Sequence, residues 1–149
     1  MERRTFIKSS CAACIPFCAL PLMLDSCAAL TNTTGKIVKD GLALNTEDFI
    51  IKEKGSSAYR SFLVVRNDTL KYPICVYRVN ANEYTALWMK CAHQGAELQA
   101  AGDTLQCPAH GSEFDNKGQV TNGPAISNLR TFPVSINGAT LFIDLKKQA

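Results

Sequence analysis

An all-β fold is the fold class that this sequence predicts, and two observations support it. From Thr31 to Ala149, short stretches of alternating apolar and polar residues are separated by turn residues about every eight to twelve positions. The periodicity of an amphipathic helix is absent from the same region. The predicted strands are Lys36–Lys39, Asp48–Lys52, Arg60–Arg66, Ile74–Val79, Tyr84–Met89, Thr104–Cys107, Thr131–Ile136 and Thr140–Leu145.

These strands hold more apolar side chains than a sheet with one buried face can use. The excess is made up of Phe62, Leu63, Val64, Val65, Ile74, Val76 and Trp88. We therefore expect about two or three small antiparallel sheets packed as a barrel-like sandwich. Asn137-Gly138 predicts a hairpin between the last two strands, whereas Lys52–Ser57 is predicted to be a polar loop.

Length and charge limit the classes of protein that remain. The 149 residues, less an N-terminal targeting segment, suffice for one domain with a sizeable core but not for two. A net charge of +3 is too near neutral to indicate nucleic-acid binding. We predict that Cys75 is a buried apolar side chain in a strand, and that Trp88 and Met89 belong to the core.

Two short segments contain both histidines of the chain. Cys91-Ala92-His93-Gln94-Gly95 holds a Cys-x-His pair, and Cys107-Pro108-Ala109-His110-Gly111-Ser112 holds a Cys-x-x-His pair. Four such ligands suit one tetrahedral zinc, or an iron–sulfur centre with thiolates on one iron and imidazoles on the other. The spacing of the first pair is tight for two ligands of one zinc, because zinc motifs usually separate paired ligands by more residues.

The two segments resemble the cluster-binding boxes of Rieske [2Fe-2S] proteins. The resemblance extends from about Ile37 to Lys146, because the order of strands, boxes and final hairpin is similar to that of a Rieske domain. It implies a Rieske-type fold, in which a cluster-binding subdomain at about 90–123 is inserted into a β base. The domain itself is expected to span 27–149.

The resemblance also implies the cofactor and its ligands. One [2Fe-2S] cluster per chain is expected, with Cys91 and Cys107 on the inner iron and His93 and His110 on the outer iron. Asn122-Gly123-Pro124-Ala125 resembles the family's proline loop. Pro124 is therefore expected to lie over the cluster from a third side.

Residues around the boxes are expected to tune the reduction potential. In high-potential Rieske proteins, a Ser two residues after the second His donates a hydrogen bond to a sulfide, and a Tyr two residues further on donates to a cysteine sulfur. Ser112 matches this pattern and Phe114 does not. Ala96 and Ala109 stand where those proteins have a disulfide. These departures disfavour quinol oxidation, and we expect an intermediate potential.

The resulting prediction is a one-electron carrier without catalytic residues or a small-molecule substrate pocket, which exchanges electrons with a redox protein donor and acceptor. A Rieske oxygenase needs a second iron held by two histidines and a carboxylate, and no further histidine is present in this sequence. A subunit role remains open, either in a bc-type quinol-oxidising complex or beside a molybdenum oxidoreductase. A zinc-binding structural module is the other alternative.

The N-terminal residues 1–26 are predicted to be an export signal. Glu2-Arg3-Arg4-Thr5-Phe6-Ile7-Lys8 resembles a twin-arginine motif, and Cys11–Leu24 is shorter than the roughly twenty apolar residues of a membrane span. Leu24-Asp25-Ser26-Cys27 resembles a bacterial lipobox, so a lipid on Cys27 would hold the domain at a membrane surface in the cell envelope or periplasm. Plain secretion and an uncleaved anchor are the alternatives.

Overall fold

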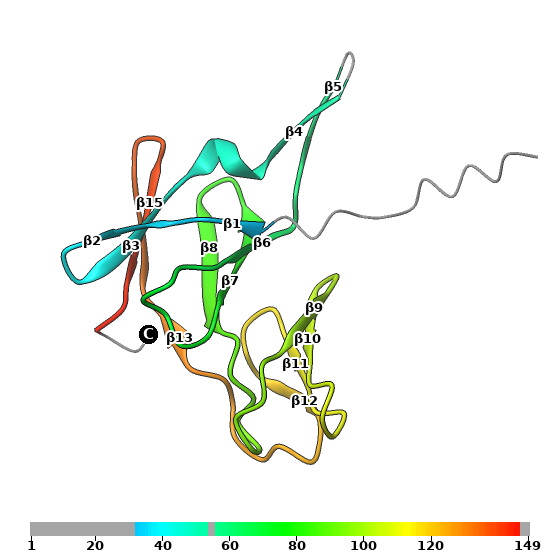
Figure 1. The fold of residues 1–149 in the computed structure, drawn as a ribbon. Coiled ribbons are helices and arrows are strands. Elements are labelled where there is room, and N and C mark those ends of the chain that lie inside the picture. The colour runs from blue at the N-terminus through cyan, green and yellow to red at the C-terminus, as the bar shows by residue number, and fades with distance from the viewer. Residues whose placement is uncertain (1–31, 54–55, 147–149) are drawn as a thin grey trace, which may run out of the picture.

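A computed structural model describes residues 32–53 and 56–146 of the protein, which form an almost entirely β fold (Figure 1). A single 3-10 helix, η1 (Thr46–Phe49), occurs in these residues. The strands are β1 (Asn32–Thr33), β2 (Lys36–Val38), β3 (Gly41–Asn45), β4 (Ile50–Glu53), β5 (Ser56–Tyr59), β6 (Phe62–Val65), β7 (Ile74–Asn80), β8 (Glu83–Trp88), β9 (Gln99–Ala101), β10 (Thr104–Gln106), β11 (Glu113–Asp115), β12 (Val120–Asn122), β13 (Thr131–Phe132), β14 (Val134–Asn137) and β15 (Thr140–Asp144).

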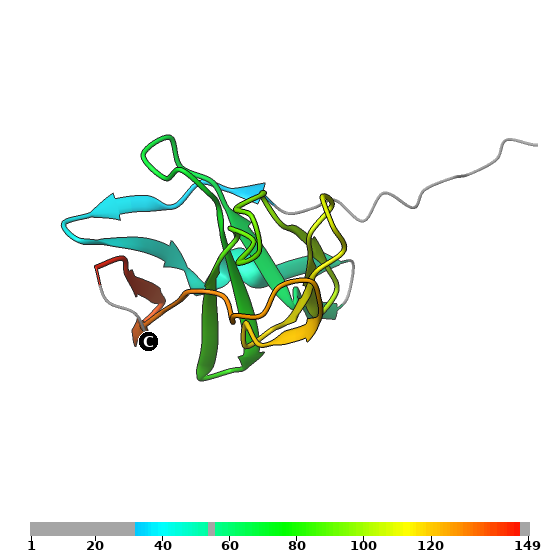
Figure 2. The same ribbon diagram turned by 90° about the horizontal axis from the view of Figure 1, so that it is seen from below.

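The strands form three main sheets and one separate hairpin. The central five-stranded sheet has the order β1-β6-β7-β8-β13, and a four-stranded sheet has the order β14-β15-β3-β2. A second four-stranded sheet, β12-β11-β10-β9, lies in the chain between β8 and β13, within the range predicted for the inserted subdomain. Figure 2 shows β7 and β8 of the central sheet in green, between the β2–β3 strands on one side and this second sheet on the other.

The central sheet is buried on both faces, which accounts for its excess of apolar residues. Successive side chains of a strand point to opposite faces. In β6, Leu63 and Val65 pack against Leu42 and Leu141 of the β14-β15-β3-β2 sheet, whereas Val64 faces the core of the inserted sheet. The second core also contains Cys75, Leu87, Leu98, Leu105, Phe114 and Leu129. The inserted sheet therefore packs on the base through continuous apolar contacts.

The predicted all-β class and the final hairpin are confirmed. Asn137 pairs with Thr140 across the turn, and Gly138 adopts φ 60° there, a conformation that glycine adopts without strain. Three details of the prediction are wrong. The first two residues of the predicted strand Asp48–Lys52 belong to the 3-10 helix η1. The predicted loop Lys52–Ser57 includes parts of both strands of the β4–β5 hairpin. Pro133 divides the predicted strand Thr131–Ile136 into β13 and β14, which join different sheets.

Other expectations are met in part or lie outside the described residues. Cys75 is fully buried in β7, as predicted, and Met89 is 2% exposed, whereas Trp88 is only half-buried. The twin-arginine motif and the lipobox lie outside the described residues. No helix in the described part of the chain is long and apolar enough to cross a membrane.

Candidate metal centre

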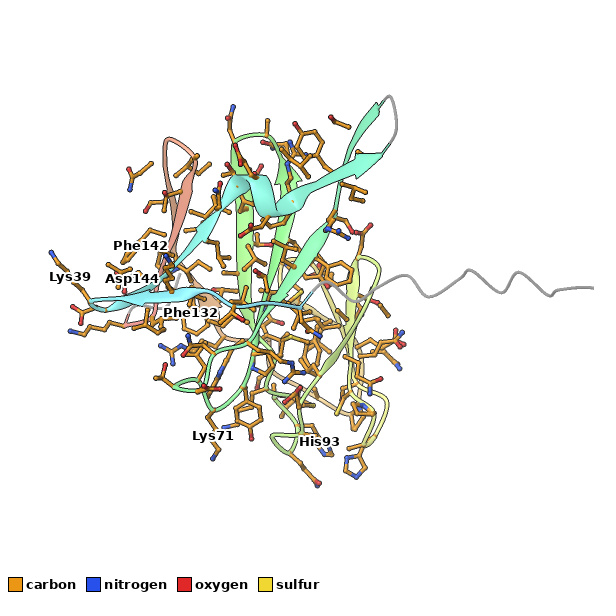
Figure 3. The ribbon with its side chains drawn as sticks, turned by 45° about the horizontal axis from the view of Figure 1, so that its top comes forward. Lys39, Lys71, His93, Phe132, Phe142 and Asp144 are labelled. Carbon is orange, nitrogen blue, oxygen red and sulfur yellow. The ribbon has the colours of Figure 1, made fainter. Side chains whose placement is uncertain are left out.

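The two Cys-His segments form neighbouring loops. Loop 1 is residues 91–96, which follow β8, and loop 2 is residues 107–112, which join β10 to β11. Both loops lie at the end of the molecule opposite the β4–β5 hairpin, where Figure 3 labels His93. The inserted sheet positions them, because Cys91 and Cys107 belong to the same buried core as Leu98, Leu105 and Phe114.

The backbones of the two loops are folded alike. The Gly95 N–H donates to the Cys91 carbonyl at 2.9 Å, and the Gly111 N–H donates to the Cys107 carbonyl at 3.0 Å. Each cysteine N–H in turn donates at 2.8 Å to the carbonyl five residues later, that of Ala96 or Ser112. The two glycines have φ values of 75° and 77°, which side chains other than glycine adopt only with strain. Loops 1 and 2 are therefore structural equivalents.

In each loop, a side chain from outside the loop donates a hydrogen bond to the carbonyl of the closing glycine. In loop 1 the Tyr72 hydroxyl donates to the Gly95 carbonyl at 2.7 Å, and in loop 2 the Asn122 side-chain amide donates to the Gly111 carbonyl at 3.1 Å. Tyr72 precedes β7 of the base, whereas Asn122 ends β12 of the inserted sheet. Loop 1 is thus tied to the base and loop 2 to the inserted sheet.

The four predicted ligands come together as two pairs. Cys91 and Cys107 are 2% and 3% exposed, and their thiols lie close enough to hydrogen-bond. Outside them, the rings of His93 and His110 meet edge to face with centroids 5.0 Å apart. His93 is half-buried and His110 is exposed. The thiols therefore face the interior and the imidazoles face solvent.

The environment of Cys107 favours its thiolate form. Burial alone would raise its pKa, but hydrogen bonding to the Cys91 thiol and to the backbone N–H groups of Ala109 and His110 outweighs burial and lowers it. Backbone N–H groups directed at a sulfur stabilise negative charge on it. This is the charge state that a cysteine needs to ligate a metal ion.

The residues present fit an iron–sulfur centre with two thiolates and two imidazoles. Nδ1 of His93 is buried and has no hydrogen-bond partner among the described residues, so this nitrogen is available as a ligand. No three His, Cys, Asp or Glu side chains of the described part of the chain are grouped as ligands of a single metal ion. The geometry provides a thiol pair and an imidazole pair, which is how a Rieske centre distributes its ligands over two irons.

Ser112, for which the sequence predicts a tuning role, is the last residue of loop 2. Its side chain is fully buried, and its Oγ accepts a hydrogen bond from the Ala125 N–H at 3.0 Å. The hydroxyl hydrogen of Ser112 remains available to donate. Ala125 is itself buried with Cys91 and Cys107, whereas Pro124, which follows a cis Gly123–Pro124 peptide bond, is exposed.

An open cavity of about 400 Å³ lies beside loop 1. Trp88, Lys90, His93, Asn128 and Arg130 contribute to its wall. The sequence did not indicate this cavity, or the roles of Tyr72 and Asn122. These residues come from separate segments, so their convergence depends on sheet register, for which their sequence positions provide no signal.

The Rieske [2Fe-2S] domain family matches residues 54–133, which are more than half of the chain. Three curated relatives illustrate the range of similar proteins. The oxygenase component of dicamba O-demethylase from Stenotrophomonas maltophilia is 36% identical over 50% of this chain and 25% of its own length. Cytochrome b6-f complex iron-sulfur subunit 1 of Nicotiana tabacum is 33% identical over 56% of this chain and 33% of its own.

The third relative is the ferredoxin subunit of 3-phenylpropionate/cinnamic acid dioxygenase from Shigella boydii, which is 34% identical over 42% of this chain and 64% of its own length. The chain thus spans between a quarter and about two thirds of these relatives. The family match agrees with the fold and with the four converging side chains. The chain therefore belongs to the Rieske [2Fe-2S] domain family, and its cofactor is a Rieske [2Fe-2S] cluster.

Proposed function

We propose that this protein is a one-electron carrier in which Cys91 and Cys107 hold the inner iron of the cluster, and His93 and His110 hold the outer iron. The observation that supports this most strongly is the pairing of two buried thiols with two outward-facing imidazoles on equivalent loops. When bound, the cluster supplies a centre that gains and loses one electron.

The chain's own residues suit this role. The inserted core buries the cysteine side chains and excludes water from them, while His93 and His110 lie nearest the solvent, where a partner can approach. Ser112 offers a hydroxyl donor from inside the site. Phe114, fully buried in the same core, offers none. With one of the two tuning donors present, we propose an intermediate reduction potential.

Metal and sulfide analysis of the purified protein tests this assignment. We expect two irons and two labile sulfides per chain. Cys91→Ser and Cys107→Ser should each abolish both, because each removes a thiolate ligand. Cys75→Ala is the matched control, since Cys75 is equally buried but lies in β7, and it should retain the full iron content. One zinc and no iron after anaerobic expression would reject the proposal in favour of a structural zinc module.

A subunit role in a larger oxidoreductase is the second candidate function. The similarity to a cytochrome b6-f iron-sulfur subunit favours it, whereas Ala96 and Ala109, in place of the disulfide of high-potential members, disfavour the quinol-oxidising version. Native electrophoresis of detergent-solubilised envelope separates the two roles. A carrier should migrate near the mass of one chain, and a subunit should migrate with its complex.

We also propose export and attachment to a membrane surface through a lipid on Cys27. The support is the resemblance of Glu2–Lys8 and Leu24–Cys27 to targeting motifs. Mass spectrometry of the mature protein should find a lipidated N-terminus at Cys27, with partition into detergent. A soluble product that starts a few residues later would reject lipidation without affecting the cluster assignment.

A further inference from the structure

A row of alternating cations and aromatic rings borders loop 1. It consists of Lys71, Tyr72, Lys90, Trp88 and Arg130, which we call the cationic face. Lys71 Nζ and Lys90 Nζ lie 5.8 and 5.9 Å from the centroid of the Tyr72 ring. Lys90 Nζ and Arg130 Cζ lie 5.2 and 5.8 Å from the Trp88 ring. The two rings meet edge to face at 5.4 Å, and Arg130 Cζ also lies 4.7 Å from the Phe132 ring, so each of the three cations contacts at least one aromatic ring.

Within the described part of the chain, no carboxylate forms an ion pair with Lys71, Lys90 or Arg130. Glu97 pairs with Lys90 across an isolated β-bridge, but its carboxylate binds Arg66. One guanidinium N–H of Arg130 donates a hydrogen bond to the Leu145 carbonyl at 3.0 Å. The face therefore carries unpaired positive charge that an external anion can neutralise.

The cavity beside loop 1 opens between these cations. Lys90 and Arg130 lie on its wall together with Trp88, and His93 forms another part of the same wall. An open cavity lined by charged and aromatic side chains is typical of a protein interface.

We propose that the cationic face is the docking site for an acidic electron-transfer protein, with a carboxylate of the partner seated between Lys90 and Arg130. This inference rests on the proposed function as an electron carrier. Seating a carboxylate there brings the partner against His93, one of the proposed outer ligands. In the encounter one protein loses an electron and the other gains it, and no bond forms or breaks.

Stopped-flow reduction of the cluster-containing protein tests the proposal. The reductant is a reduced plant-type ferredoxin, chosen as an acidic protein of low potential. The test variants are Lys90→Gln and Lys90→Gln/Arg130→Gln. The matched control is Lys36→Gln/Lys39→Gln, which removes two exposed charges from β2 and the turn after it; Figure 3 shows Lys39 far from Lys71 and His93. Photoreduced lumiflavin, an uncharged reductant, reports whether the cluster itself accepts electrons.

We expect the double variant to be reduced by the ferredoxin about tenfold more slowly than wild type at low salt, because steering by opposite charge is lost. The difference should vanish at roughly 0.5 M salt, where charges are screened. Lys90→Gln alone should give an intermediate rate, and Arg130→Lys, which keeps the charge, should stay near wild type. The control pair and all lumiflavin rates should be unchanged within about twofold.

Equal ferredoxin rates for the Lys90 and Lys36 variants at low salt would overturn the docking site while leaving the carrier function intact. If the double variant does not fold, the single variant Lys90→Gln decides: a ferredoxin rate equal to that of the wild type would also overturn the docking site. A cluster that lumiflavin cannot reduce would instead reject the carrier function, and the docking proposal with it. The two failures are therefore distinguishable.

Discussion

Loops 1 and 2 have the same backbone but different surroundings, and the difference shows how this centre is held. Each loop starts at a buried cysteine and closes four residues later at a glycine with positive φ. The carbonyl of that glycine binds Tyr72 of the base in loop 1 and Asn122 of the inserted sheet in loop 2. A centre shared by both loops is thus connected to two parts of the protein at once.

The side chains at the sixth position of each loop extend the contrast. Loop 1 has Ala96 there, and loop 2 has Ser112, whose hydroxyl accepts the Ala125 N–H. Loop 1 is bordered by the cationic face and its cavity, whereas Ser112 of loop 2 is buried beside Ala125 and the loop residues 108–111 are exposed. We propose that a partner approaches beside loop 1, and that Ser112 of loop 2 supplies the donor that tunes the centre.

The glycines that close the loops provide the largest expected effect. Gly95→Ala and Gly111→Ala should each destabilise the protein by about 1–2 kcal/mol, because alanine is strained at these φ values. Gly95→Ala should cost more, since its Cβ would lie 3.2 Å from Lys90 Cε, while the Cβ at position 111 would meet no atom within 4 Å. Chemical denaturation of both variants measures this order, and an equal loss would remove the crowding argument.

The Cys75 and Cys107 side chains are both buried, but their thiol pKa values shift in opposite directions. The stability of the protein should therefore depend on pH. Burial raises the pKa of Cys75 from its ordinary value of 9.0 to about 12, whereas that of Cys107 is lowered. Because folding favours the neutral Cys75 thiol, its stabilising contribution is complete below pH 9 and is lost between pH 9 and 12. At pH 10 the loss should be about 1.4 kcal/mol.

Urea denaturation of the wild type and of Cys75→Ala between pH 7 and 10 checks this loss. The free energy of unfolding of the wild type should fall more steeply than that of the variant. Parallel pH profiles would show that the Cys75 thiol does not titrate differently in the folded and unfolded states.

The two hydrogen bonds to the glycine carbonyls should differ in strength. Tyr72→Phe should lower stability by about 1 kcal/mol, because the bond is short and half-buried. Asn122→Ala should cost about 0.5 kcal/mol, since its longer bond is exposed to water. Tyr59→Phe, at an exposed tyrosine stacked on Arg78, is the control for losing a hydroxyl. Thermal denaturation and the rate of iron loss to a chelator provide two measurements. If Tyr72→Phe and Tyr59→Phe give the same stability and the same rate of iron loss, the Tyr72–Gly95 hydrogen bond does not stabilise loop 1.

The Ser112 hydroxyl provides the smallest expected effect, when the change in reduction potential is expressed as a free energy. Ser112→Ala should lower it by tens of millivolts, where about 59 mV is a tenfold change for one electron, because the more negative reduced centre loses a donor. Phe114→Tyr, which adds a hydroxyl in the same core, should raise the potential. Ser127→Ala, at an exposed serine, should have no effect. If voltammetry shows equal potentials for all four proteins, hydrogen bonding does not tune this centre.

The sequence by itself determined the fold class and the candidate ligands. Alternating apolar residues define strands because the strand period is two, and Cys91, His93, Cys107 and His110 stand out because they include every histidine of the chain. Ser112 followed from the resemblance to high-potential Rieske proteins, which have a serine at this distance from the second histidine. The burial of Cys75 followed from its apolar strand, and the structure agrees.

Tertiary structure decided what depends on pairing between distant segments. The short strands β9, β11 and β12 carry too few apolar residues to show a period, and β3 and β5 form because partner strands supply their hydrogen bonds. Tyr72, Asn122 and the cationic face likewise acquire their roles only when sheet register brings them to loops 1 and 2. Local pattern reports on a residue's own strand, whereas these contacts depend on how whole sheets pack, which no local pattern records.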